Sequence, residues 1–145
     1  MHIESILTAK GSEVKTIKPD ARVADAVQRM RNERVSALVV SEDGSTIAGI
    51  VSDRGIMNAI ADDGIGVMER QIGSIMTQKV FTCQRGDRVA SIMAMMTSRR
   101  IRHIPVVDGE GQLTGIVSIG DVVKHHLDEI QQEADGLRQY ISASW

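Results

Sequence analysis

An internal duplication runs through most of the 145 residues of the chain. A shift of 66 residues places residues 14–57 on residues 80–123, with about 12 identities in 44 positions where chance would give roughly three. The longest shared run is Gly-Ile-Val-Ser, at residues 49–52 and again at 115–118. One copy of about 60 residues is near the lower size limit for a stable core. We therefore expect the two copies to pack face to face with pseudo-two-fold symmetry.

Each copy begins with the pattern of a strand and a helix. The strand is expected at residues 14–16 and 80–82, and the helix that follows is expected to be capped by Asp20 and Asp87. Apolar residues along this helix recur at i, i+3, i+4 and i+7, which is one face of an α-helix. They are Val23, Ala26, Val27 and Met30 in the first copy and Val89, Ile92, Met93 and Met96 in the second.

Two β-branched runs and a second helix complete each copy. Residues 37–40 and 47–51 are joined by Glu42-Asp43-Gly44-Ser45, a hairpin turn signal, and the second copy repeats the pattern up to residue 117. The second helix is expected after Ser52 and after Ser118. The predicted fold class is therefore α/β (α+β), with tandem β-α-β-β-α repeats followed by a C-terminal helix.

We divide the chain at composition shifts and at the repeat limits. The expected parts are a first repeat with its N-terminal segment (1–63), a connector (64–72), a second repeat (73–126) and a helical tail (127–145). At a slightly larger shift, Ile6-Leu7-Thr8 of the N-terminal segment matches Ile75-Met76-Thr77.

The tail carries a heptad-like apolar seam in which residues are spaced alternately four and three apart. These residues are Val123, Leu127, Ile130, Ala134, Leu137 and Ile141. Gly136 weakens the helix by ~1 kcal/mol relative to Ala. Two interpretations remain open, in which the helix packs on a partner subunit or folds back on its own lobe.

Composition excludes several classes of protein. The 17 basic and 19 acidic residues give a net charge of -2, which argues against a general nucleic-acid binder, and three aromatic residues cannot form a base-stacking platform. No apolar run approaches ~18 residues, so no membrane span is expected. Cys83 alone can form neither an internal disulfide nor a multi-Cys metal site, and we expect it to pack as a small apolar residue. It fits a reducing compartment, and because no secretory signal is visible we expect a cytoplasmic protein.

A Ser-x-x-Asp pattern stands where the last strand of the second copy meets a helix. Ser118 is placed to cap that helix and Asp121 lies in its first turn, which is a variant of the capping box and needs no ligand. The same geometry suits a nucleotide, because free N–H groups at a helix start attract phosphate and a carboxylate can accept two ribose hydroxyl protons. Spacing alone leaves both interpretations open.

The duplication, the run Arg102-His103-Ile104-Pro105-Val106-Val107 and the run Gly115-Ile116-Val117-Ser118-Ile119-Gly120-Asp121 together resemble the cystathionine-β-synthase (CBS) domain pair. The resemblance covers residues 5–125, and the layout is similar to that of stand-alone bacterial proteins made of one such pair. It implies disc-like dimers that sense adenine nucleotides and regulate another protein. It also implies that Ser118 holds phosphate and Asp121 holds ribose.

The resemblance further implies which residues complete the ligand site. Basic residues at the entrance of the middle strand reach phosphates in such pairs, which points to Arg102 and His103, although an ordinary solvated helix end is the alternative. The first strand and the middle-strand entrance of the other copy are also expected at the site, so that adenine lies among aliphatic side chains and backbone amides. The remaining expected contacts are Val14, Thr16, Val35, Ser36, Ala37 and Ile116.

The first copy departs from this pattern. Gly55 stands where Asp121 stands in the second copy, so the ribose carboxylate is missing. We expect a second, weaker site there that includes Ser52 and Val80. Arg54 is either a phosphate contact or an ordinary exposed helix residue.

No catalytic constellation is visible, since the chain has neither a P-loop nor a Gly-x-Gly-x-x-Gly run. We expect a non-catalytic regulatory module, a homodimer, that binds an adenosine-containing small molecule and controls an unknown protein. AMP is the first-choice ligand and ATP or NAD the alternatives. No metal and no required cofactor is expected, nor a nucleic-acid or membrane partner. The alternative function is a ligand-free scaffold for oligomerisation and interaction.

Overall fold

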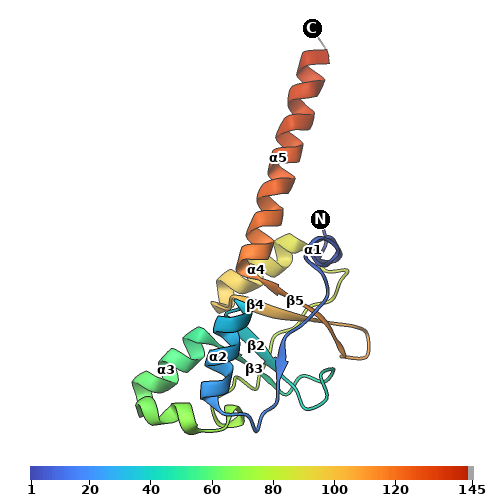
Figure 1. Ribbon diagram of the computed structural model, residues 1–145. Coiled ribbons are helices and arrows are strands. Elements are labelled where there is room, and N and C mark those ends of the chain that lie inside the picture. The colour runs from blue at the N-terminus through green and yellow to red at the C-terminus, as the bar shows by residue number, and fades with distance from the viewer. Residues whose placement is uncertain (144–145) are drawn as a thin grey trace.

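The computed structural model describes residues 1–143, and the two predicted repeats are both present (Figure 1). The first repeat contains β1 (Thr16–Ile17), α2 (Val23–Glu33), β2 (Ala37–Val40), β3 (Gly49–Ser52) and α3 (Asp53–Asp63). Strand β2 pairs in parallel with β1 and antiparallel with β3. The predicted turn between β2 and β3 is confirmed, because Asp43 accepts hydrogen bonds from the N–H groups of Ser45 and Thr46.

The second repeat contains α4 (Val89–Arg99), β4 (His103–Val107), β5 (Leu113–Ser118) and α5 (Ile119–Ala143). Strands β4 and β5 pair antiparallel. The prediction of a strand at residues 80–82 is wrong, because this part of the chain forms only a single parallel bridge, between Cys83 and Val106. This bridge is the counterpart of the Ile17–Val40 pair between β1 and β2. The first-repeat strand is likewise later than expected, since β1 begins at Thr16.

The predicted helix caps are wrong by one or two residues. Arg22 and Arg88 are the N-cap residues of α2 and α4, and the helices begin at the buried residues Val23 and Val89. Asp87 instead accepts the Gln84 N–H at 2.9 Å in the turn before the helix. Burial of the first apolar residue therefore sets the helix start, and Asp87 stabilises the turn that precedes α4.

The two cores exchange the segments that precede the repeats. Helix α1 (Ile3–Lys10) follows the N-terminus but packs its apolar face into the core of the second repeat. Two short 3₁₀ helices, η1 (Ile65–Glu69) and η2 (Ile72–Ser74), precede the second repeat but pack into the core of the first. The packing thus groups α1 with the second repeat, although the division at residue 63 placed it with the first.

The Gly of each Gly-Ile-Val-Ser run lies where an exchanged segment presses on a strand. A Cβ atom at Gly49 would lie 2.7 Å from Met76 Sδ and 2.8 Å from the Thr77 carbonyl oxygen. At Gly115 it would lie 2.8 Å from Leu7 Cδ1. The backbone contact with Thr77 requires glycine at residue 49, whereas at residue 115 only the Leu7 side chain would have to shift. The glycine of the repeated run is therefore in both repeats the point at which a segment of the other repeat packs against the strand.

Cys83 packs in the second core, as expected of a small apolar residue. Burial, with a smaller effect of Asp87, raises the pKa of the Cys83 thiol to about 12. The thiol therefore stays protonated at neutral pH.

The C-terminal helix extends away from the two repeats (Figure 1). It runs without a break from Ile119 to Ala143, so the boundary expected at residue 127 does not coincide with a structural break, and residues 144–145 lie outside the described residues. Leu127 and Leu137 are 59% and 60% exposed. The interpretation that this helix folds back on its own lobe is therefore wrong. Among residues 1–143, no helix combines the length and apolar character that crossing a membrane requires.

Candidate nucleotide clefts

Two clefts lie at equivalent places in the two repeats. The first, called here the Ser118 cleft, has a volume of about 240 Å³. Its walls are Lys10, Arg34, Val35, Ser36, Ala37, His103, Ile116 and Ser118. The structure thus brings together six of the predicted ligand contacts.

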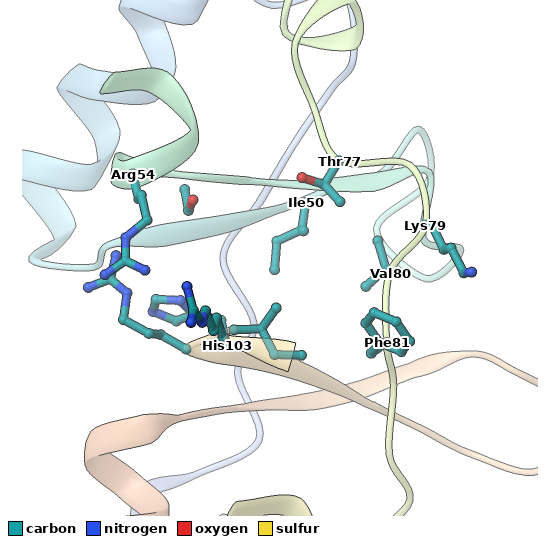
Figure 2. A pocket seen from close by; sticks show the side chains of 11 residues that line it. Ile50, Arg54, Thr77, Lys79, Val80, Phe81 and His103 are labelled. Atoms are coloured by element: carbon teal, nitrogen blue, oxygen red, sulfur yellow. The ribbon is translucent and has the colours of Figure 1, made fainter. Parts of the chain in front are cut away.

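The second, called here the Ser52 cleft, has a volume of about 170 Å³ and is drawn in Figure 2. Its walls are Ile50, Ser52, Arg54, Thr77, Lys79, Val80, Phe81, Arg100, Ile101, Arg102 and His103. Both residues expected at the weaker site, Ser52 and Val80, line it. Phe81 was not anticipated, so aliphatic side chains are not the only apolar surface offered to a ligand.

Ser118 and Asp121 form a reciprocal cap at the start of α5. The Asp121 N–H donates to Ser118 Oγ at 3.2 Å, and the Ser118 N–H donates to Asp121 Oδ2 at 2.9 Å. Oδ2 also accepts from Lys10 Nζ at 2.8 Å, whereas Oδ1 accepts no hydrogen bond from residues 1–143. One carboxylate oxygen is therefore open to a ligand hydroxyl, and bidentate binding would require Lys10 to move.

The charge on Asp121 is stabilised in spite of partial burial. Burial acts to raise its pKa, but the hydrogen bonds from Lys10 and from the Ser118 N–H outweigh it and hold the pKa below its usual value. Asp121 is thus an ionised acceptor at neutral pH, which is the state that binds two hydroxyl protons best.

Lys10 was missed by the sequence analysis. It comes from the end of α1, which reaches the second repeat because the exchanged segments cross over, and its Nζ also donates to the Ile116 carbonyl oxygen at 3.1 Å. The shift that matches Ile6-Leu7-Thr8 to the second copy also places Lys10 on Lys79, which lines the Ser52 cleft. That agreement was a usable signal for both lysines.

Arg34 and Arg100 were also missed, although the repeat places one on the other. Each is the C-cap of its helix with a left-handed backbone, at φ values of 56° and 55°, and each lines one of the two clefts. Non-glycine residues with positive φ are uncommon. The identical position of two arginines in this conformation marks a feature shared by both clefts.

Arg102 lies at the Ser52 cleft and not at the Ser118 cleft, to which the sequence analysis assigned it. The reason is the crossed arrangement, in which the middle-strand entrance of one repeat faces the helix start of the other. Arg102 Nη2 donates to Asp53 Oδ1 at 2.6 Å, and the same oxygen accepts the Arg54 N–H at 2.7 Å. Burial opposes these bonds, but together they hold the pKa of Asp53 below its usual value.

His103 belongs to both clefts and forms part of the wall between them. Its Nε2 lies 2.9 Å from Ser36 Oγ. Burial, and then the positive charge of Arg102, lower its pKa. His103 is therefore neutral at pH 7, and it is the one predicted contact that lines both clefts.

Val14 and Thr16 are not on the walls of the Ser118 cleft, and neither is Asp121, which instead hydrogen-bonds to the wall residues Lys10 and Ser118. Thr16 lines a different hollow, beside Arg29, and its carbonyl oxygen accepts a hydrogen bond from that guanidinium. For Val14 and Thr16, contact with a ligand in this cleft stays a prediction from the resemblance, without support from the described geometry.

Comparisons with known proteins agree with this architecture. The family model of the CBS domain matches residues 5–62 and again residues 72–128, so the chain belongs to the CBS domain family. It is 38% identical over 130 residues to the mitochondrial CBS domain-containing protein CBSX3 of Arabidopsis thaliana, a match that covers 87% of this chain and 63% of that protein.

Solved structures show the same fold. The CBS-domain containing protein ATU1752 from Agrobacterium tumefaciens is 34% identical, with a TM-score of 0.83 over 87% of this chain and 99% of the other. The CBS domain protein PAE2072 from Pyrobaculum aerophilum, complexed with AMP, is 23% identical, with a TM-score of 0.73 over 83% of this chain and 89% of the other. The chain therefore has the fold of a CBS domain pair.

Proposed function

We propose that the chain is a non-catalytic regulatory module that binds an adenine nucleotide in the Ser118 cleft, with AMP as the first-choice ligand and ATP or NAD as alternatives. The observation that carries this proposal is the ionised Asp121 carboxylate, which contacts Lys10 and Ser118 on the walls of a cleft of about 240 Å³ and whose Oδ1 accepts no hydrogen bond from residues 1–143. The AMP complex of the Pyrobaculum aerophilum relative supports the choice of ligand class. Lys10 and Arg34 supply positive charge for a phosphate.

Ligand binding would act through the contacts it replaces. A ribose held by both oxygens of Asp121 displaces Lys10, which fixes α1 to the second repeat. A ligand that binds one arrangement better than the other shifts the population towards it, and so changes the affinity for the regulated protein.

Isothermal titration calorimetry with AMP, ATP and NAD tests this function. Asp121→Asn removes the charge but keeps an oxygen that can accept the Ser118 N–H, so we expect a loss of affinity of about tenfold or more with little change in stability. Asp25→Asn is the matched control, because Asp25 accepts the Arg22 N–H at 3.2 Å in the same helical position away from both clefts. Absence of binding by the wild-type protein to all three nucleotides would contradict the proposal.

We further propose that the chain is a homodimer joined through the seam of α5, the feature that also favours the alternative of a ligand-free scaffold. Val123, Leu127, Ile130, Leu137 and Ile141 are all between 40% and 60% exposed. In a parallel pair of helices Glu133 of one copy would face Arg138 of the other across this seam. Sedimentation equilibrium tests the pairing, with Leu127→Glu and Leu137→Glu together expected to give a monomer, and Gln132→Glu on the opposite face as the control. A monomeric wild-type protein would overturn the homodimer.

A further inference from the structure

The Lys10 ammonium occupies the place that a ribose is proposed to take beside Asp121. Its Nζ donates to Asp121 Oδ2 at 2.8 Å and to the Ile116 carbonyl oxygen at 3.1 Å. Asp121 Oδ2 is one of the two carboxylate oxygens that a diol would use, and Ile116 lies on the wall of the Ser118 cleft. An internal cation therefore fills an acceptor that a ligand hydroxyl needs.

This ion pair is partly shielded from water. The side chains of Lys10 and Asp121 are 34% and 24% exposed. Among the described residues that form the walls of the cleft none is acidic, and Arg34 adds a second positive charge. A ligand that takes Asp121 therefore leaves Lys10 without a carboxylate on the cleft wall, and an unpaired charge in a partly buried place is costly.

Lys10 can change its partner without disturbing the fold. It is the last residue of α1, whose Ile6 and Leu7 side chains are buried in the second core. A lysine ammonium lies at the end of a flexible four-carbon chain and has three rotatable donors. The side chain can therefore turn from Asp121 to a ligand while α1 stays packed.

The equivalent lysine of the first repeat provides an internal comparison. Lys79 lines the Ser52 cleft, but Gly55 stands there in place of Asp121, and within residues 1–143 Lys79 has no ion-pair partner. The pairing of a lysine with a carboxylate at the helix start is therefore confined to the Ser118 cleft and is not required by the fold.

We propose that Lys10 is a specificity-determining residue that makes binding beside Asp121 conditional on a negative charge in the ligand. A nucleotide offers its phosphate to Lys10 in exchange for Asp121, whereas a neutral nucleoside breaks the ion pair and supplies no replacement charge. Hydrogen bonds between two charged groups are roughly twice as strong as neutral ones, so the exchange favours a ligand with phosphate. The inference rests on the proposed function and deepens it, because it assigns the class of ligand: an adenosine compound with an anionic group next to the sugar.

Calorimetric titration with adenosine, and with each of AMP, ATP and NAD, tests this role in the wild-type protein and in Lys10→Met. Adenosine should bind the variant up to about fivefold more tightly, because no partly exposed ion pair has to break. The nucleotides should bind it more weakly, because the phosphate loses its cation. The ratio of nucleotide affinity to adenosine affinity should therefore fall by about tenfold or more, whereas a structural defect would weaken all ligands together. Lys10→Gln should behave like Lys10→Met, and Lys10→Arg should restore the wild-type ratio.

Lys18→Met is the control, because Lys18 is exposed and lines neither cleft. Its ratio should stay within about twofold of the wild-type value. Thermal melts establish that each variant is folded. An unchanged ratio in Lys10→Met, or an equal loss for adenosine and nucleotides, would overturn the role of Lys10 and leave the nucleotide site in place. Absence of binding by the wild-type protein to AMP, ATP and NAD would contradict the proposed function itself, and the role of Lys10 with it.

Discussion

The Ser118 cleft and the Ser52 cleft are built from the same parts and differ in charge. Each has a lysine from an exchanged segment, an arginine at a left-handed helix C-cap, and a serine at the end of the last strand. The Ser118 cleft adds the Asp121 carboxylate to this frame, whereas the Ser52 cleft adds Arg54 and Arg102. The two repeats therefore share the same frame of lysine, arginine and serine, and the clefts differ in charge because a few other side chains differ.

The difference in charge between the clefts therefore arises from side chains and not from the backbone. The serine at the helix start caps its helix in both repeats, because Gly55 N–H donates to Ser52 Oγ at 3.1 Å just as Asp121 N–H donates to Ser118 Oγ. The cap is therefore structural and common to both, while the carboxylate is present in only one.

The largest effect is expected from the glycines at the crossing points. Gly49→Ala should lower the free energy of unfolding by about 1–3 kcal/mol, because its Cβ meets the Thr77 carbonyl oxygen at 2.8 Å. That carbonyl cannot move freely, since it accepts the Ile50 N–H. Gly115→Ala should cost less, because its Cβ meets only the Leu7 side chain. Urea denaturation measures both, and equal losses would show that the two crossings are equally rigid.

The next effect is expected from giving the Ser52 cleft its missing carboxylate. Gly55→Asp should add a second AMP site, with a gain of about tenfold or more in affinity at that cleft. The new Cβ would lie 3.3 Å from Ser52 Oγ, and its φ lies outside the left-handed range, so the substitution needs only a small shift of the hydroxyl. Gly55→Ala controls for the Cβ alone. Calorimetric stoichiometry distinguishes the two, and one site per chain in both variants would contradict the comparison.

A smaller change is expected when Arg102 is released. Asp53→Asn keeps an acceptor for the Arg54 N–H but removes the charge that holds Arg102, whose side chain is 35% exposed. Because partly exposed ion pairs contribute about 0.2–1 kcal/mol, ATP should bind at the weaker site of the Ser52 cleft up to about fivefold more tightly, as calorimetry measures. Asp25→Asn, which removes a similar pair with Arg22, should leave binding unchanged. Weaker binding in Asp53→Asn would show that Asp53 organises the cleft instead of competing with the ligand.

The smallest effect concerns the wall that the clefts share. Burial and Arg102 lower the pKa of His103 in the folded protein, so below pH 6.5 the unfolded chain binds more protons at this residue than the folded one does. Stability therefore rises with pH through this window and is lost as pH falls towards the lowered pKa. His103→Gln keeps a polar partner for Ser36 and should flatten the slope, as measured by denaturation between about pH 5 and pH 7. An unchanged slope would mean that the pKa of His103 is not lowered in the folded protein.

Much of the fold could be predicted because it rests on local patterns. The spacing of Val23, Ala26 and Met30 gave a helix face that is buried, and the antiparallel pairs β2–β3 and β4–β5 were read from β-branched runs around turn residues. The wrong predictions concern the ends and lengths of single elements. The strand expected at residues 80–82 is reduced to one bridge at Cys83, and the caps expected at Asp20 and Asp87 are displaced because burial of Val23 and Val89 decides where the helices start.

The duplication, the types of the elements, and the Ser-x-x-Asp pattern with its loss at Gly55 can all be predicted, because each depends only on the order of residues along the chain. Three features become visible only in the folded protein: α1 packs in the core of the second repeat, Lys10 reaches Asp121, and Arg102 lines the Ser52 cleft. Those assignments depend on which segments cross over between the two cores. Which segments cross over is determined by the burial of side chains that are far apart in the sequence, and no local sequence pattern predicts it.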